Sequence, residues 1–178
     1  MSTEREVESQ TIGSLVNIET SAKYGSWTGA EITAFLSETL IPMRLSVCTS
    51  SGPLIVPLWF EYLDGRLISC SPEDSLLVRS LRRQPEVAFD VSTNDLPYQG
   101  VRGRGHARCE TATDSVMLAG LLRRYLAGTD NRLAEWLLNR SGPEALIEVE
   151  VSWLTSWDFT ERMGDIERIA DRSPNARL

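Results

Sequence analysis

The sequence has little of what a metal centre or a disulfide framework requires. Its 178 residues include a single histidine, His106, and three widely spaced cysteines with no C-x-x-C pair. One histidine rules out a two-histidine metal site within one chain, and separated cysteines in odd number do not form a disulfide framework. We therefore expect no metal site. We expect Cys48, Cys70 and Cys109 to be reduced thiols, buried among apolar side chains.

Long apolar segments and net positive charge are also missing. No apolar run approaches the roughly 20 residues that a membrane-spanning helix needs, so we expect no membrane partner. The first residues, MSTEREVESQ, are polar and acidic, unlike a secretory or transit peptide, which predicts a cytoplasmic protein. The formal net charge of −7 disfavours broad binding to nucleic acid, because phosphate backbones attract basic surfaces.

Motifs for nucleophilic or nucleotide chemistry are absent as well. The sequence has no G-x-S-x-G, P-loop or Rossmann glycine pattern. The stretch Gly103-Arg104-Gly105 lacks a third glycine and a strand-to-helix context, so it indicates close packing between strands. The residue pattern alone identifies no catalytic residue.

What the sequence does contain predicts one domain. Polar residues without periodicity fill positions 1–26, which we interpret as a flexible arm, and positions 171–178 as a frayed tail. The domain itself is expected over 27–170. It should open with a short helix, because Thr28 and Glu31 form a capping-box pattern and Pro42 follows the apolar stripe.

Short runs of β-forming residues, separated by turn residues, predict an antiparallel sheet. Pro57 lies inside the second run; because proline cannot donate to a ladder, it indicates an edge strand, a bulge or a strand facing a ligand cavity. The six expected strands cover residues 43–49, 54–62, 66–71, 86–91, 100–109 and 145–153, with residues 157–159 extending the last strand or starting a seventh.

Helical spacing predicts further helices between the strands. Ser71 and Pro72 favour a helix start, and Pro85 ends that helix, whose buried stripe would contain Leu77 and Leu81 and whose other side carries Arg79. Two more helices are expected over 114–127 and 130–139. Six short strands with interspersed helices predict an α+β antiparallel barrel with flanking helices rather than a doubly wound sheet.

The central segment carries a more specific pattern. The stretch IPMRLSVCTSSGPLIVPLWFEYLDGRLISCSPEDSLLVRSLRRQPEVAFDV, followed by PYQGVRGRGHA, resembles the flavin-binding split-barrel family related to pyridoxamine 5′-phosphate oxidase. The resemblance covers about residues 41–109, with a weaker echo in TSWDFTERM. It implies a six-stranded antiparallel split β-barrel, a homodimer, and FMN bound at the dimer interface.

The resemblance also implies which residues hold the cofactor. The strand from Val56 through Pro57 and Leu58 to Trp59 would lie along the flavin ring, and the segment from Ser71 to Arg79 would wrap the ribityl phosphate. A helix start offers free N–H groups to a phosphate. Ser75 matches the family's serine in this segment. With Arg102 added as a candidate replacement cation, the expected cofactor-binding residues are Val56, Pro57, Leu58, Trp59, Ser71, Ser75, Arg79 and Arg102.

Departures from the family pattern leave the cofactor open. Leu76 and Leu77 occupy positions where many relatives carry cations that pair with the phosphate. Arg79, Arg102 or Arg104 could substitute, because a guanidinium can hold a phosphate bidentately. The alternatives to FMN are the deazaflavin F420, haem with His106 as axial ligand, or no redox cofactor. For His106 itself we favour an ordinary strand residue.

These observations lead to one leading hypothesis and two alternatives. The leading hypothesis is a flavin-dependent oxidoreductase that passes a hydride between FMN and an unidentified small-molecule substrate. The alternatives are an F420-dependent reductase and a non-catalytic ligand-binding or interaction module that has lost tight FMN phosphate binding.

Overall fold

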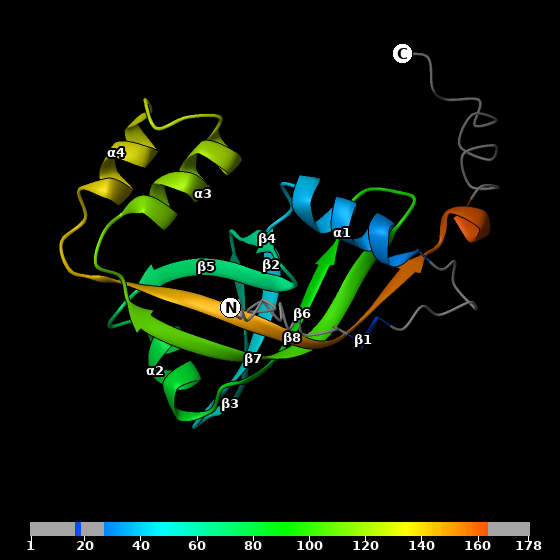
Figure 1. Ribbon diagram of the computed structural model, residues 1–178, viewed down its shortest axis with the longest axis horizontal. Helices are drawn as coiled ribbons and strands as arrows, with labels where there is room; N and C mark the ends of the chain where they lie inside the picture. Colours follow the sequence, from blue (N-terminus) through cyan, green and yellow to red (C-terminus); the bar gives the residue numbers. More distant parts are fainter. Residues whose placement is uncertain (1–16, 19–26, 164–178) are drawn as a thin grey trace, which may run out of the picture.

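The computed structural model describes residues 17–18 and 27–163, and these form one mixed sheet with helices on its outside (Figure 1). The neighbouring strands follow the order β3-β2-β6-β7-β8-β5-β4, and every pair along this path is antiparallel. The strands of this path are β2 (Met43–Thr49), β3 (Gly52–Leu58), β4 (Glu61–Leu63), β5 (Arg66–Pro72), β6 (Glu86–Ser92), β7 (Gln99–Thr111) and β8 (Glu144–Asp158).

The two ends of this path are joined by only two residues. β3 ends at Leu58 and β4 begins at Glu61, so Trp59 and Phe60 bring the outer strands of the sheet together. A sheet whose first and last strands are so close in the chain must roll up, which gives a split barrel. The α+β split-barrel prediction is therefore confirmed.

The strand count differs from the six that were predicted. The predicted strand over 54–62 is divided into β3 and β4, because the backbone leaves the ladder at Trp59 and Phe60. Residues 157–158 continue β8 rather than starting a new strand. A further two-residue strand, β1 (Asn17–Ile18), pairs in parallel with Trp153 and Leu154 of β8. It lies in the predicted arm; the remainder of that arm and the tail over 171–178 lie outside the described residues.

The position of Pro57 agrees with its chemistry. β3 is the first strand in the sheet order, and Pro53 and Pro57 both lie in it. Neither proline can donate a hydrogen bond to a neighbouring strand, and an edge strand needs only one set of partners. The edge interpretation of Pro57 is confirmed.

Glycines in β7 allow the barrel wall to pack closely, as the Gly-Arg-Gly pattern predicted. A Cβ at Gly103 would lie 2.5 Å from the ring of Phe89 and 2.6 Å from the carbonyl oxygen of Trp153. A Cβ at Gly105 would lie 2.5 Å from the carbonyl oxygen of Glu150. The alternate residues Arg102 and Arg104 point outward and are exposed.

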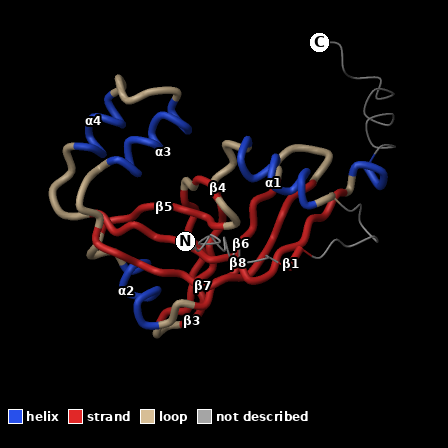
Figure 2. Tube along the Cα trace, in the orientation of Figure 1, coloured by secondary structure: helices blue, strands red, loops and turns tan. Residues whose placement is uncertain are grey.

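The helices lie on different sides of the barrel (Figure 2). α1 (Gly29–Glu38) begins with the predicted capping box, since Glu31 N–H donates to the Thr28 hydroxyl and Thr28 N–H donates to the Glu31 carboxylate. α3 (Val116–Leu126) and α4 (Arg132–Leu138) form a hairpin beside β5, with α2 (Leu76–Arg83) on the other side of the strands in that view. No helix in the described residues is long and apolar enough to span a membrane.

The predicted start of α2 at Ser71 and Pro72 is wrong. Both residues belong to β5, and the helix begins one turn later with Ser75 as its N-cap. The Ser75 hydroxyl accepts a hydrogen bond from the Val78 N–H at 3.1 Å. A serine therefore caps the helix, as expected, but it is Ser75 and not Ser71. Leu77 and Leu81 form the predicted buried stripe.

Candidate cofactor cleft

A cleft of about 420 Å³ lies where the edge of the barrel meets the α3–α4 hairpin. We call it the helix-covered cleft. Its barrel side includes Pro57, Leu58 and Trp59 from the end of β3 and Ser71 from the end of β5. Its helix side is built from four leucines. The lining residues are Pro42, Pro57, Leu58, Trp59, Cys70, Ser71, Pro72, Leu118, Leu121, Leu133, Leu137, Arg140 and Glu144.

Side chains hold the wall of this cleft in place where the ladder is interrupted. The buried Ser69 hydroxyl donates to the carbonyl oxygen of Trp59 at 2.7 Å. The Tyr125 hydroxyl accepts the Phe60 N–H at 3.2 Å and lies 3.3 Å from the Phe60 carbonyl oxygen, to which it donates. The Tyr125 ring also stacks on Trp59, with centroids 5.2 Å apart and planes 13° apart. Backbone groups without strand partners are thereby satisfied, and Trp59 is held flat against α3.

The adjacent residue of α3 anchors the hairpin to α1. The Arg124 guanidinium donates to the carbonyl oxygen of Thr39 at 2.8 Å and to that of Leu36 at 3.4 Å. These carbonyls lie at the C-terminal end of α1, where a helix leaves acceptors without partners and its dipole favours a cation. The end of α3 is thus fixed to both the barrel edge and α1.

The polar end of the cleft contains one ion pair and one thiol. Arg140 pairs with Glu144 four residues later. Burial, with a smaller contribution from the nearby Glu144 carboxylate, raises the pKa of the Cys70 thiol to about 12, and Arg140 opposes this shift. The thiol is therefore protonated near neutral pH and is a poor nucleophile. Cys48, Cys70 and Cys109 are free thiols as predicted, but all three are half-buried rather than buried, which corrects that expectation.

Ser71, at the end of β5, connects this cleft to the start of α2. Its hydroxyl donates to the hydroxyl of the N-cap residue Ser75 at 3.2 Å. Leu77 is only 4% exposed and belongs to the core, whereas Leu76 is 52% exposed. Arg79 is exposed, and its guanidinium donates to the carbonyl oxygen of Asp74 beside the helix start. Of the two positions where many relatives carry a cation, only position 76 faces solvent in this chain.

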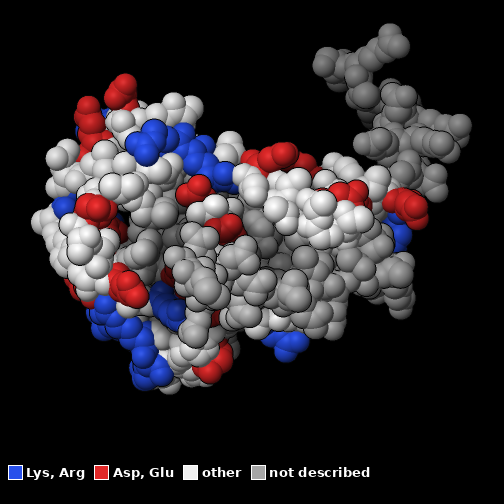
Figure 3. All heavy atoms as spheres, viewed as in Figure 1, with Lys and Arg blue, Asp and Glu red and all other residues white. Residues whose placement is uncertain are grey.

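Negative charge at this helix start is partly neutralised. Glu73 forms an ion pair with Arg82 at 2.5 Å and accepts a hydrogen bond from the Thr111 hydroxyl at 3.2 Å. Asp74 is exposed to water. Basic side chains gather over α2 in the space-filling view (Figure 3), where Arg79, Arg82 and Arg83 are exposed.

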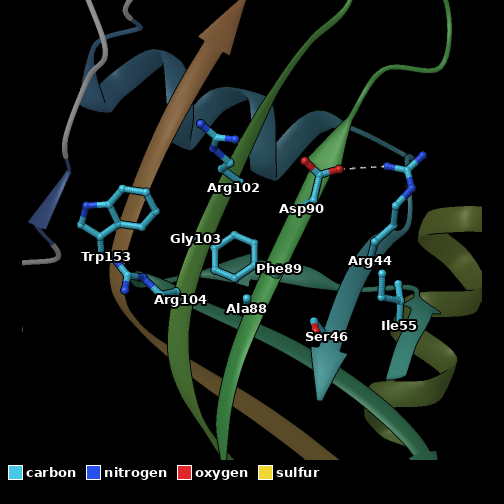
Figure 4. Close-up of a pocket in the computed structure, with 10 residues that line it drawn as sticks. All are labelled: Arg44, Ser46, Ile55, Ala88, Phe89, Asp90, Arg102, Gly103, Arg104 and Trp153. Carbon is cyan, nitrogen blue, oxygen red and sulfur yellow. Dashed lines mark hydrogen bonds and ion pairs between the residues drawn. The ribbon is translucent and has the colours of Figure 1, made fainter. Parts of the chain in front are cut away.

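Arg102 lies elsewhere, on the outer face of the sheet. We define this outer face by the residues around a shallow hollow of about 450 Å³: Arg44, Ser46, Ile55, Ala88, Phe89, Asp90, Arg102, Gly103, Arg104 and Trp153 (Figure 4). Arg44 pairs with Asp90 at 3.2 Å, and the Arg104 guanidinium lies 4.8 Å from the centre of the Trp153 ring. The guanidinium of Arg102 has no partner among the described side chains. This face is therefore cationic with an aromatic wall.

The predicted site residues fall into three groups. Pro57, Leu58, Trp59 and Ser71 line one cleft. Ser75 and Arg79 lie beside it at the start of α2, and the Val56 side chain packs against the core from β3. Arg102 does not share this cleft within one chain.

The sequence-based reasoning missed the helix side of the cleft. Its four leucines follow ordinary helical spacing, which does not distinguish a cleft wall from a core. In the structure, α4 leaves Leu133 47% and Trp136 61% exposed, which the sequence pattern does not reveal. Tyr125 gave no signal, because its partners are backbone atoms of Phe60, 65 residues away.

His106 is an exposed residue of β7 that pairs in register with Glu86 and Glu150. Within residues 17–18 and 27–163, no group of three His, Cys, Asp or Glu side chains is arranged to hold a metal ion.

The architecture defines a split-barrel protein with a cleft at the barrel edge. No protein-family model matches the chain, and no curated protein matches it either. Solved structures do match. One is a conserved hypothetical protein from Mycobacterium tuberculosis, with a TM-score of 0.65, 19% identity and coverage of 82% of this chain and 92% of that one.

Two further solved structures carry names that state an enzyme activity. An F420 reductase aligns with a TM-score of 0.53 at 20% identity, covering 67% of this chain and 92% of that one. A candidate pyridoxamine 5′-phosphate oxidase from Listeria innocua aligns with a TM-score of 0.54 at 13% identity, covering 74% and 97%. The chain therefore has the split-barrel fold of the pyridoxamine 5′-phosphate oxidase-related proteins, which confirms the resemblance at the level of the fold.

Proposed function

We propose that the protein binds a flavin-type cofactor, with FMN as the first candidate, and acts as an oxidoreductase on a small molecule. The observation that supports this most is the meeting of Pro57, Leu58 and Trp59 with Ser71 around one cleft. These residues come from the ends of β3 and β5 and the break after β3, and the family resemblance assigned them to a flavin ring and its phosphate. The names of the F420 reductase and the pyridoxamine 5′-phosphate oxidase candidate are in line with this proposal.

The apolar part of the cleft fits a flavin ring. Leu58 and Trp59 offer an apolar wall, and β3 is an edge strand, so one side of its backbone has no strand partner. Backbone N–H and carbonyl groups on that side are available to the polar edge of a ring. Clefts with apolar walls and a few placed polar groups are typical of cofactor sites.

The phosphate end depends on fewer groups than in many relatives. The first-turn N–H groups of α2, the Ser71 hydroxyl and the Arg79 guanidinium are the groups that we assign to it. The Ser75 hydroxyl already caps α2, so its role is to hold the helix start in place. Because Leu76 and Leu77 contribute no charge, Arg79 is the first cationic side chain of α2, and we assign the cation at this end to it.

When bound, a flavin supplies the hydride and electron chemistry, and the chain supplies position and exclusion of water. Tyr125 and Ser69 fix the backbone at Trp59 and Phe60, so the ring-binding wall is rigid. The leucines of α3 and α4 keep water away from the space opposite this wall. The protonated Cys70 thiol does not compete as a nucleophile.

The proposal includes a homodimer with cofactor at the interface. Arg102 and Arg104 lie on the outer face, away from the cleft of their own chain, and a second copy could bring them to it. Arginine and tryptophan, both present on this face, are common at the centres of interfaces. A two-fold arrangement would use the same surface of each copy. Light scattering that gives the mass of one chain at all concentrations would contradict this part.

A second candidate function follows from the missing cations. Without a charge at position 77, which is buried, tight binding of the FMN phosphate rests on few groups. An F420-dependent reductase, or a non-catalytic module, would not need tight binding of the FMN phosphate. Absorption spectra with FMN and with F420 separate these candidates.

The test of the phosphate assignment is Arg79→Ala, with Arg83→Ala as the matched control on the same helix. We expect Arg79→Ala to weaken FMN binding about tenfold and Arg83→Ala to leave it unchanged. Riboflavin, which lacks the phosphate, should bind both variants as it binds the unmodified protein. Equal FMN affinity in both variants would remove Arg79 from the site.

A further inference from the structure

The helix-covered cleft has few charged lining residues, although it lies beside the segment that we assign to the cofactor phosphate. Of its lining residues only Arg140 and Glu144 carry charge, and they are paired with each other. Leucines supply the whole helix side, and apart from Glu144 the barrel side consists of uncharged residues, including Pro57, Leu58 and Trp59. No unpaired charge among the described lining residues is therefore available to a charged guest.

Burial of a charge in such a place is unfavourable. A phosphate, carboxylate or ammonium group that entered between the leucines of α3–α4 and Trp59 would lose its water without gaining a counter-ion. To recruit Arg140, an anion would have to displace Glu144, a largely buried carboxylate whose second oxygen has no hydrogen-bond partner among the described residues, and would leave it without its ion pair. A neutral apolar molecule has no charge to desolvate and does not need to break the Arg140–Glu144 ion pair.

From this balance we propose that the α3–α4 hairpin is the specificity element of the cleft and selects an uncharged, apolar substrate. The inference rests on the proposed function, since it assigns to substrate the space opposite the cofactor's wall. It excludes phosphorylated substrates at this position. The anion-holding groups, Ser71 and Arg79, lie toward the start of α2 and serve the cofactor end.

Leu133 is the residue that tests the inference most directly. It lines the cleft from α4 and is 47% exposed, so a polar replacement there does not enter the core. Trp136, three residues later on the same helix and 61% exposed, does not line the cleft. Leu133→Arg and Leu133→Gln, with Trp136→Arg as control, change the same helix at similar exposure.

The probes share one ring and differ in charge: naphthylmethanol is neutral, naphthylmethyl phosphate is anionic and naphthylmethylamine is cationic at neutral pH. Their affinities would be measured by calorimetry for the protein with and without saturating FMN. We expect the neutral probe to bind at least about tenfold more tightly than either charged probe. Leu133→Arg should reverse the order of the neutral and anionic probes, Leu133→Gln should weaken the neutral probe, and Trp136→Arg should change neither.

Three outcomes would overturn the inference. The first is equal or tighter binding of a charged probe to the unmodified protein. The second is the same change in Leu133→Arg and Trp136→Arg, which would place the probe outside the cleft. The third is loss of the neutral probe on saturation with FMN, because the cofactor would then fill the space assigned to substrate. FMN binding is read separately from its own absorption, so failure of the proposed cofactor and failure of the substrate class are distinguishable.

Discussion

The hydroxyl of Tyr125 satisfies both backbone groups of Phe60, accepting the N–H at 3.2 Å and donating to the carbonyl oxygen at 3.3 Å. One side chain of α3 thus replaces two ladder bonds at the break between β3 and β4. The same ring stacks on Trp59 in the wall of the cleft. The fold and the candidate site are joined at this residue.

Replacement of Tyr125 by phenylalanine should destabilise the protein. The change keeps the ring but leaves two half-buried backbone groups without their partner, which costs about 1–3 kcal/mol of unfolding free energy. Urea unfolding would measure it. Tyr98→Phe, at a residue that is 39% exposed, is the control and should stay within about 0.5 kcal/mol of the unmodified protein. Equal stability of the two variants would show that water replaces the Tyr125 hydroxyl.

Two glycines should respond to alanine with opposite signs. A Cβ at Gly103 would collide with the Phe89 ring and the Trp153 carbonyl, so Gly103→Ala should lower the unfolding free energy by about 1–3 kcal/mol. Gly120 lies within α3 with nothing within 4 Å of its Cβ position. Gly120→Ala should therefore raise stability by about 0.5–1 kcal/mol, since alanine favours a helix. Thermal unfolding measures both effects: Gly103→Ala tests the packing of β7 against β6 and β8, and Gly120→Ala tests the open space beside α3.

A lysine introduced at position 76 and one introduced at position 77 should have different effects on FMN affinity and on stability. Leu76 is 52% exposed at the start of α2, so Leu76→Lys should tighten FMN binding about tenfold with little change in stability. Leu77 is 4% exposed, and Leu77→Lys should cost about 3 kcal/mol or more because it buries an unpaired charge. FMN titration and urea unfolding measure the two effects. No gain of affinity in Leu76→Lys would place the phosphate away from α2.

The raised pKa of the Cys70 thiol predicts that the protein loses stability at alkaline pH. Burial raises its pKa from 9.0 to about 12 in the folded state, so the folded protein holds the proton more tightly than the unfolded chain. The stabilisation is complete below about pH 9 and is lost as the pH rises toward about 12. Between about pH 8 and pH 10 the unmodified protein should lose more unfolding free energy than Cys70→Ala. Parallel losses in the two proteins would contradict the raised pKa of this half-buried thiol.

Much of the barrel could be predicted from local residue chemistry. The Thr28–Glu31 capping box, the edge position of Pro57 and the close approach at Gly103 each depend on one residue type with a restricted conformation or contact. The break at Trp59 and Phe60 could not be predicted, because both residues favour strands and their partners, Ser69 and Tyr125, are chosen by the tertiary fold.

The candidate site was predictable on one side only. Pro57 to Trp59 and Ser71 carry a resemblance, whereas Leu118, Leu121, Leu133 and Leu137 read as ordinary helix leucines. The cysteines were misjudged for a related reason. Their burial depends on which strand ends and helix edges they meet, and the half-buried positions of all three follow from the fold rather than from residue type.

The most direct test of the central proposal is an absorption spectrum of the purified protein, followed by thermal melting with added FMN. A ligand that binds only the folded state raises the melting temperature in a saturable manner. We expect flavin absorption bands, or a saturable rise with FMN that riboflavin reproduces only weakly. A colourless protein whose melting temperature does not respond to FMN would contradict the flavin proposal, and a response to F420 alone would favour the deazaflavin reductase.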